Sequence, residues 1–76
     1  MRTFDKIVSD SFHIPERDVD DRMSSKDIPG WDSMNYLLFI AELEKQFDVS
    51  LTMDEVMSAR TLGDIRKAMI SKGANT

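Results

Sequence analysis

The amino-acid sequence predicts an all-α fold, a small four-helix bundle with a long first loop and a short third helix. Apolar residues recur at helical spacing in separate segments, each preceded by Thr or Asp, residue types favoured at helix N-caps. No segment alternates apolar and polar residues as a half-buried strand does. A chain of 76 residues builds one small hydrophobic core, so we expect a single domain over residues 1–76.

The first helix is expected over about residues 3–13. Thr3 is a candidate N-cap, and Pro15 disfavours helical backbone in the residue before it. The apolar residues between them recur at helical spacing and should face the core: Phe4, Ile7, Val8 and Phe12.

A long loop is expected over residues 14–32, which are rich in Asp, Ser and Pro and end in the turn signal Pro29-Gly30. Its spaced apolar residues, Val19, Met23 and Ile28, favour a loop strapped across the core.

The second helix is expected over residues 33–47, with Asp32 as its N-cap. One apolar stripe should face the core: Tyr36, Ile40, Leu43 and Phe47, with Leu37 at its edge. Three apolar residues remain on the opposite side, and we interpret them as a candidate docking strip: Met34, Leu38 and Ala41.

Two capping signals predict the last two helices. Thr52 followed by Glu55 predicts a short helix over about 53–58, and Thr61 followed by Asp64 predicts a helix ending near residues 72–73. The inner face of the last helix should hold Leu62, Ile65, Met69 and Ala68. Three methionines are expected to fill gaps in the core: Met53, Met57 and Met69.

Composition disfavours several classes of function. The net charge of −4 repels a phosphate backbone, so we expect no nucleic-acid binding. No apolar run approaches the length that spans a bilayer and no signal peptide is evident, so the expected location is cytoplasmic. Because the chain has no cysteine, any thiol that it uses must belong to an attached group.

The titratable residues predict neither an enzyme nor a metal site. His13 is the single histidine, and its place at the end of a helix favours contact with that helix end or with solvent. The cluster of Asp18, Asp20 and Asp21 fails as a calcium loop, because Arg22 and Met23 stand at the fifth and sixth positions.

The segment from Gly30 to Met34 carries the remaining signal. At its simplest, Asp32 caps the second helix, Trp31 packs as a staple against the next turn, and Ser33 is a polar residue of the first turn. However, a serine at a helix N-terminus, after a long loop and beside surplus apolar residues, is well placed to hold a phosphate.

Asp32-Ser33-Met34 resembles the Asp-Ser-Leu attachment motif of the acyl carrier protein family, and the surrounding pattern agrees along most of the chain. The resemblance implies that a phosphopantetheinyl transferase moves 4′-phosphopantetheine from coenzyme A onto Ser33, with Asp32 and Met34 supporting the motif. The thiol of this arm would carry acyl groups as thioesters, and Ser33 would be an attachment site, not a catalytic residue.

The resemblance also implies partners: a loading ligase or synthase and downstream acyltransferases of a fatty-acid, polyketide or related specialised pathway. Family members usually dock through acidic residues along the second helix, where this chain has Asn35 and Leu38. We therefore expect a monomer that docks through an apolar strip with a charged rim, formed by Met34, Leu38, Ala41, Glu42, Asp54 and Glu55.

Two alternatives stay open. An aminoacyl, D-alanyl or peptidyl carrier has the same fold and arm. A small helical interaction module would use the strip of Met34, Leu38 and Ala41 as a protein-binding surface and leave Ser33 unmodified. The sequence does not name the cargo or the pathway.

Overall fold

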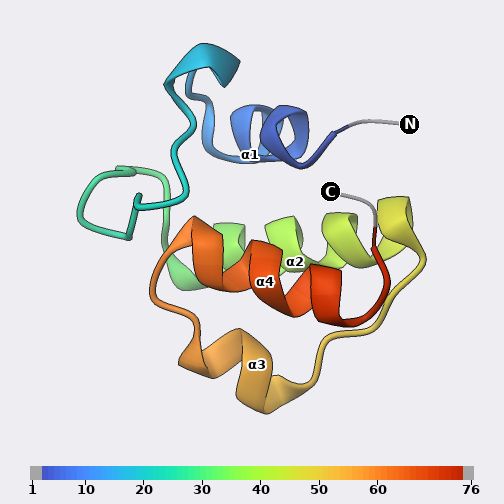
Figure 1. The fold of residues 1–76 in the computed structure, drawn as a ribbon. Helices are drawn as coiled ribbons and strands as arrows, with labels where there is room; N and C mark the ends of the chain where they lie inside the picture. Colours follow the sequence, from blue (N-terminus) through green and yellow to red (C-terminus); the bar gives the residue numbers. More distant parts are fainter. Residues whose placement is uncertain (1–2, 75–76) are drawn as a thin grey trace.

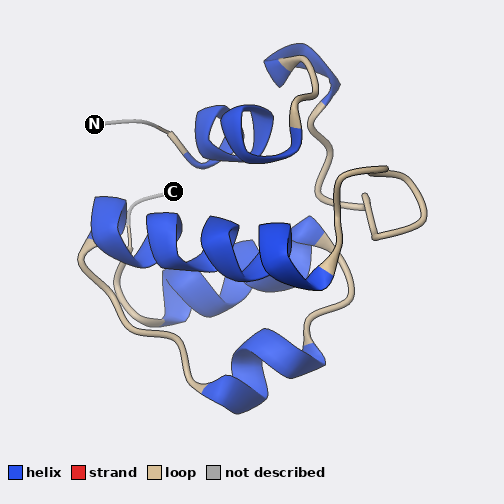
Figure 2. Ribbon diagram, turned by 180° about the vertical axis from the view of Figure 1, so that it is seen from behind, coloured by secondary structure: helices blue, strands red, loops and turns tan. Residues whose placement is uncertain are grey.

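The computed structural model describes residues 3–74, and their regular structure consists of helices (Figures 1 and 2). The elements are α1 (Phe4–Phe12), the short 3₁₀ helix η1 (Glu16–Asp18), α2 (Ser33–Phe47), α3 (Met53–Ser58) and α4 (Leu62–Ser71). The α2 and α4 helices lie in the middle, with α1 and α3 on opposite sides of them (Figure 1). The prediction of a small four-helix bundle with a long first loop and a short third helix is confirmed.

Each of the four predicted N-cap residues is confirmed. The side chains of Thr3, Asp32, Thr52 and Thr61 each accept a hydrogen bond from the backbone N–H three residues on. These bonds satisfy N–H groups that an α-helix cannot pair internally. The boundaries of α2 and α3 accordingly agree with the predicted ones.

The core stripe predicted for α2 is confirmed: Ile40 and Leu43 are buried, and Tyr36 and Phe47 pack half-buried against the core. The prediction missed Phe39 and was wrong for Leu37. Phe39 is fully buried, whereas Leu37, expected at the edge of the core stripe, is 54% exposed. The ring of Phe39 lies 6.0 Å from that of Phe4 and 5.2 Å from that of Phe12. The buried sector of α2 therefore extends toward α1, because aromatic side chains of α1 cover that side of the helix.

Two of the three methionine predictions are wrong. Met69 is fully buried, but Met53 and Met57 are 68% and 72% exposed. The α3 helix has only six residues and buries one side chain, Val56. A polar contact ties it to α2: the Tyr36 hydroxyl donates to the Val56 carbonyl oxygen at 2.6 Å.

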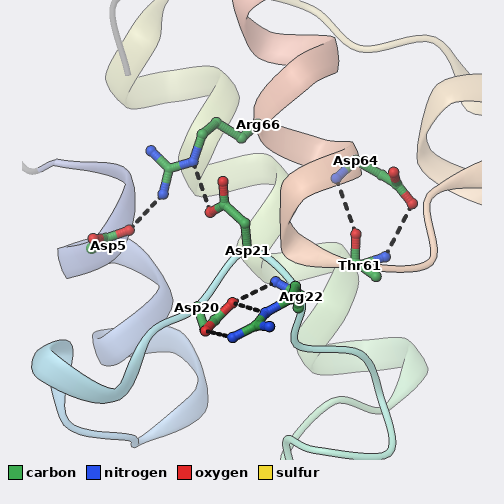
Figure 3. Close-up of polar contacts among 7 residues, drawn as sticks. All are labelled: Asp5, Asp20, Asp21, Arg22, Thr61, Asp64 and Arg66. Atoms are coloured by element: carbon green, nitrogen blue, oxygen red, sulfur yellow. Dashed lines mark hydrogen bonds and ion pairs between the residues drawn. The ribbon is translucent and has the colours of Figure 1, made fainter.

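The first loop is tied to α4, as Figure 3 shows. Ile28 of the loop is buried, while Val19 and Met23 pack half-buried against the core. The guanidinium of Arg66 in α4 donates to Asp21 of the loop at 3.0 Å and to Asp5 of α1 at 2.7 Å (Figure 3). The long loop is therefore strapped across the core as predicted, and the short helix η1 within it was not predicted.

Candidate cofactor-attachment site

Ser33 is the first residue of α2, and the segment in front of it is held by hydrogen bonds. Asp32 accepts the Asn35 N–H on its carboxylate at 2.9 Å and the Tyr36 N–H on its carbonyl at 2.8 Å. The side-chain amide of Asn35 donates back to the Gly30 carbonyl at 3.0 Å. These bonds place Ser33 at a defined point of the surface with its side chain exposed.

Trp31 sets the direction in which the chain enters α2. Its indole stacks on the ring of Phe12 at 5.7 Å and on that of Tyr36 at 5.3 Å between centroids. The contact with Tyr36 joins the residue before the N-cap to the fourth helical residue, which is the geometry of a hydrophobic staple. The predicted staple is confirmed, and it extends to α1 through Phe12.

The backbone at Ser33 has unused hydrogen-bond donors. Within residues 3–74, no hydrogen bond involves the Ser33 hydroxyl, the Ser33 N–H or the Met34 N–H. The first turn of α2 has no acidic residue, whereas those of α1, α3 and α4 have one or two. The free N–H groups and the positive end of the helix dipole suit a phosphate group bonded to Ser33.

The predicted docking strip is exposed on α2. Met34 is 73% and Leu38 62% exposed, and Ala41 is exposed on the same helix. Leu38 also lines an open hollow of about 310 Å³ between α1 and α2, together with Glu42, Asn35, Asp10 and Ser11. Sequence reasoning missed the last two residues because they belong to α1, more than twenty residues away.

The predicted acidic rim falls into two groups. Glu42 lies beside Leu38 in α2 and accepts a hydrogen bond from the Gln46 amide at 3.1 Å. Asp54 and Glu55 lie in α3, and Glu55 is engaged within the protein: it accepts the Thr52 N–H at 2.8 Å and pairs with Lys72 at 2.9 Å. These contacts, the Thr52 hydrogen bond above all, hold the pKa of Glu55 below its ordinary value.

His13 and Asp20 each take part in a local hydrogen bond. His13 is an exposed residue with φ of 59° that ends α1, and its N–H donates to the Ser9 carbonyl. Asp20 forms hydrogen bonds to Arg22 that lower the pKa of the aspartate. In the part of the chain that the structure describes, no group of three or more His, Cys, Asp or Glu residues is placed to hold a metal ion.

No helix within residues 3–74 combines the length and apolar character needed to cross a membrane. The family model described as "Phosphopantetheine attachment site" matches residues 2–69. The match includes Ser33 and its flanking residues, the whole first loop, and helices α1 to α3 with most of α4.

Proposed function

The chain belongs to the family of phosphopantetheine-binding carrier proteins, and we propose that Ser33 is the residue to which its cofactor is attached. Members of this family carry covalently bound 4′-phosphopantetheine, and the cofactor of this chain is therefore 4′-phosphopantetheine, taken from coenzyme A. The observation that supports Ser33 is its exposed hydroxyl at a helix start with two unpaired N–H groups. The whole chain, residues 1–76, would act as one carrier domain.

Attachment to Ser33 requires a transferase as a partner. The Ser33 oxygen would form a bond to phosphorus while the phosphoanhydride bond of coenzyme A breaks and adenosine 3′,5′-bisphosphate leaves. The hydroxyl proton would pass to a base of the transferase, because the Asp32 carboxylate already accepts the Asn35 N–H and the single histidine ends α1. In this proposal the chain supplies the acceptor oxygen and the electrostatics of the helix start.

We infer that the carried groups are acyl groups. When bound, the cofactor supplies the thiol that the sequence lacks, and this thiol carries the cargo as a thioester. The residues of this chain position the arm and present it to partner enzymes, which perform the bond-making steps of a fatty-acid, polyketide or related specialised pathway. Asp32 before the serine favours acyl cargo over peptidyl cargo, and a D-alanyl carrier is the alternative that shares this residue.

The docking surface for these partners would be the α2 strip of Met34, Leu38 and Ala41. The hollow beside Leu38 has carboxylates from two helices, Asp10 and Glu42. This arrangement suits a partner whose apolar contact is flanked by an Arg or Lys side chain. Asp54 and Glu55 on α3 would extend the charged rim and steer the encounter.

Leu38→Glu tests this surface, with Ile70→Glu as the matched control because Ile70 is 53% exposed on α4. We expect Leu38→Glu to lower kcat/KM of the transferase at least tenfold without changing the circular dichroism spectrum. The control should retain the parent rate. Equal rates for both variants would remove the α2 strip from the docking surface.

The attachment site is tested by intact-protein mass spectrometry after incubation with coenzyme A and a broad-specificity phosphopantetheinyl transferase. The parent and Ser50→Ala, which removes an exposed serine elsewhere, should gain the mass of one phosphopantetheinyl group, and Ser33→Ala should gain none. A gain that persists in Ser33→Ala would contradict the assignment of Ser33. No gain in the parent with several transferases would favour the unmodified interaction module.

The monomeric state and the cytoplasmic location stay predictions. Sedimentation of the apo and loaded protein checks the first, and fractionation of cells that express the chain checks the second.

A further inference from the structure

A second polar feature lies close to Ser33, where the end of the first loop meets the turn between α3 and α4. An open hollow of about 390 Å³ lies there, lined by Ser24, Ser25, Lys26, Trp31, Arg60 and Thr61 together with Ala59. Trp31 precedes Ser33 by two residues, so their Cα atoms are at most about 7 Å apart. A group attached to Ser33 therefore starts beside one wall of this hollow.

Contacts within the fold hold several of the residues that line the hollow. Ser24 and Thr61 form an isolated antiparallel bridge, and the Leu62 N–H donates to the Met23 carbonyl at 3.0 Å. The indole of Trp31 is clamped by the stacked rings described above. The hollow is therefore preformed, and a ligand would not have to order the backbone around it.

The rim of the hollow has two cations without an anionic partner. Lys26 and Arg60 form no ion pair with any residue of the range 3–74, whereas Lys6, Arg22, Arg66 and Lys72 do. Arg17, Lys45 and Lys67 form no ion pair within that range either, and Lys26 and Arg60 differ from these three in lining one hollow together. The pair would attract a negatively charged ligand that carries its own oxygens.

The carboxylates of Asp27 and Asp64 do not line the hollow, and backbone N–H groups hold both of them. Asp27 accepts the Ser24 N–H at 3.0 Å, and Asp64 accepts the Arg60 and Thr61 N–H groups at 2.9 and 3.2 Å. The hydroxyl groups of Ser25 and Thr61 add neutral donors at the same place. Cations and hydroxyl donors around a preformed hollow suit a carboxylate or a phosphate.

We propose that this hollow is an oxyanion site that receives a negatively charged group of the arm or its cargo, with Lys26 and Arg60 as its charged ligands. The proposal rests on the proposed attachment at Ser33. Two sources offer the same chemistry: a carboxylate at the far end of the acyl cargo, and the phosphodiester of the arm itself. We assign the first as the ligand, because the phosphodiester is bonded to Ser33 beside the free N–H groups of α2.

The test uses the single tryptophan as its reporter, since Trp31 lines the hollow. The protein is loaded on Ser33 with succinyl- or butyryl-phosphopantetheine from the matching coenzyme A thioester, so that the two cargoes differ mainly in a terminal carboxylate. We expect the succinyl form alone to change the Trp31 emission and the amide shifts of Ser25, Arg60 and Thr61. The difference should vanish near 1 M salt, where the Debye length is about 3 Å.

Charge variants identify the ligands of the anion. Lys26→Gln and Arg60→Gln should each abolish most of the difference between the succinyl and butyryl forms, and Lys45→Gln, on an exposed part of α2, should leave it unchanged. Both rim residues are exposed, so their variants should keep the parent circular dichroism spectrum. Identical spectra for the succinyl and butyryl forms of the parent would overturn the assignment of the cargo carboxylate.

The arm without cargo separates the two sources. If the spectral change is already complete in the unloaded arm-bearing form and depends on Lys26 and Arg60, the phosphodiester is the ligand and the oxyanion site stands. If no form differs from the apo protein, even with added inorganic phosphate, the site is overturned although attachment at Ser33 is intact. Failure of the arm to attach at all would instead overturn the proposed function.

Discussion

The N-termini of α2 and α4 are capped in the same way but differ in their other hydrogen bonds. In both helices a capping side chain, Asp32 or Thr61, accepts the N–H three residues on. At α4, the next two N–H groups are also paired: Leu62 donates to the Met23 carbonyl at 3.0 Å and Gly63 to the Asp21 carbonyl at 2.8 Å. At α2, the corresponding groups have no partner within residues 3–74. We call the N-terminus of α4 the closed start and the N-terminus of α2 the open start.

The third residue of each helix also differs between the two starts. At the closed start it is Asp64, whose carboxylate accepts hydrogen bonds from the Thr61 N–H (Figure 3) and the Arg60 N–H. At the open start it is Asn35, whose amide donates to the Gly30 carbonyl and brings no negative charge. The closed start thus supplies its own anion and the open start leaves room for an external one. One start anchors the loop, and the other leaves Ser33 exposed beside two N–H groups without a partner among the described residues.

The largest expected effect is on stability, because the closed start has a buried side chain where the open start has an exposed one. Leu62→Ala empties a fully buried position at the closed start and should lower the free energy of unfolding by about 2–5 kcal/mol. Met34→Ala at the open start removes a side chain that is 73% exposed, and the change should stay within about 0.5 kcal/mol. Urea unfolding of both variants measures the difference, and comparable losses would refute the contrast in packing.

The next largest effect tests how closely the first loop packs against the N-terminus of α4. A Cβ atom at Gly63 would lie 3.0 Å from the Asp21 carbonyl oxygen and 3.2 Å from the Asp21 Cβ. Gly63→Val should therefore push the loop away and destabilise the protein by about 1–3 kcal/mol. Met34→Val, at the same position of the open start, meets no loop and serves as control. Hydrogen exchange should show faster exchange of the Leu62 N–H in Gly63→Val alone.

Local signals explain why the helices could be predicted from the sequence. The caps Asp32, Thr52 and Thr61 act on residues three positions away, so a short window of sequence contains the whole interaction. The exposure of Ser33 and of the docking strip follows from the same helical period. These features needed no knowledge of how the helices pack.

Contacts between distant segments explain what the sequence could not predict. Arg66 joins Asp5 at a separation of 61 residues, and its guanidinium lies 4.3 Å from the centroid of the Phe4 ring. The hollow beside Trp31 is likewise lined by both Lys26 and Arg60, which are far apart in the sequence. The burial of Phe39 depends on which side of α2 the first helix covers, which periodicity alone does not decide.

A smaller effect concerns charge at the open start. Ser33→Asp places a carboxylate at the first position of α2 and should stabilise the apo protein by about 0.3–1 kcal/mol at low ionic strength. The negative charge of the neighbouring Asp32 reduces this gain. Ser58→Asp, at the last residue of α3, puts the same charge at a helix C-terminus and should have the opposite sign. Urea unfolding at low and high salt checks both, and equal responses would contradict an uncompensated dipole at α2.

The smallest expected effect concerns the carboxylate of Asp64 at the closed start. Hydrogen bonds from the Arg60 and Thr61 N–H groups hold the pKa of Asp64 below its ordinary value of 3.8. The folded state therefore binds this proton more weakly than the unfolded state, and Asp64 contributes stability above pH 3.8 that is lost as the pH falls through the lower folded pKa.

Asp64→Asn should be less stable than the parent at neutral pH, and its stability should fall less steeply below pH 3.8. Asp54→Asn removes an equal charge from the first turn of α3, where the carboxylate accepts no hydrogen bond from the described residues, and is the matched control for the lost charge. Thermal unfolding between pH 2 and 7 measures all three proteins. Parallel curves for the parent and Asp64→Asn would mean that the closed start depends on the loop carbonyls, and that the carboxylate of Asp64 adds nothing to it.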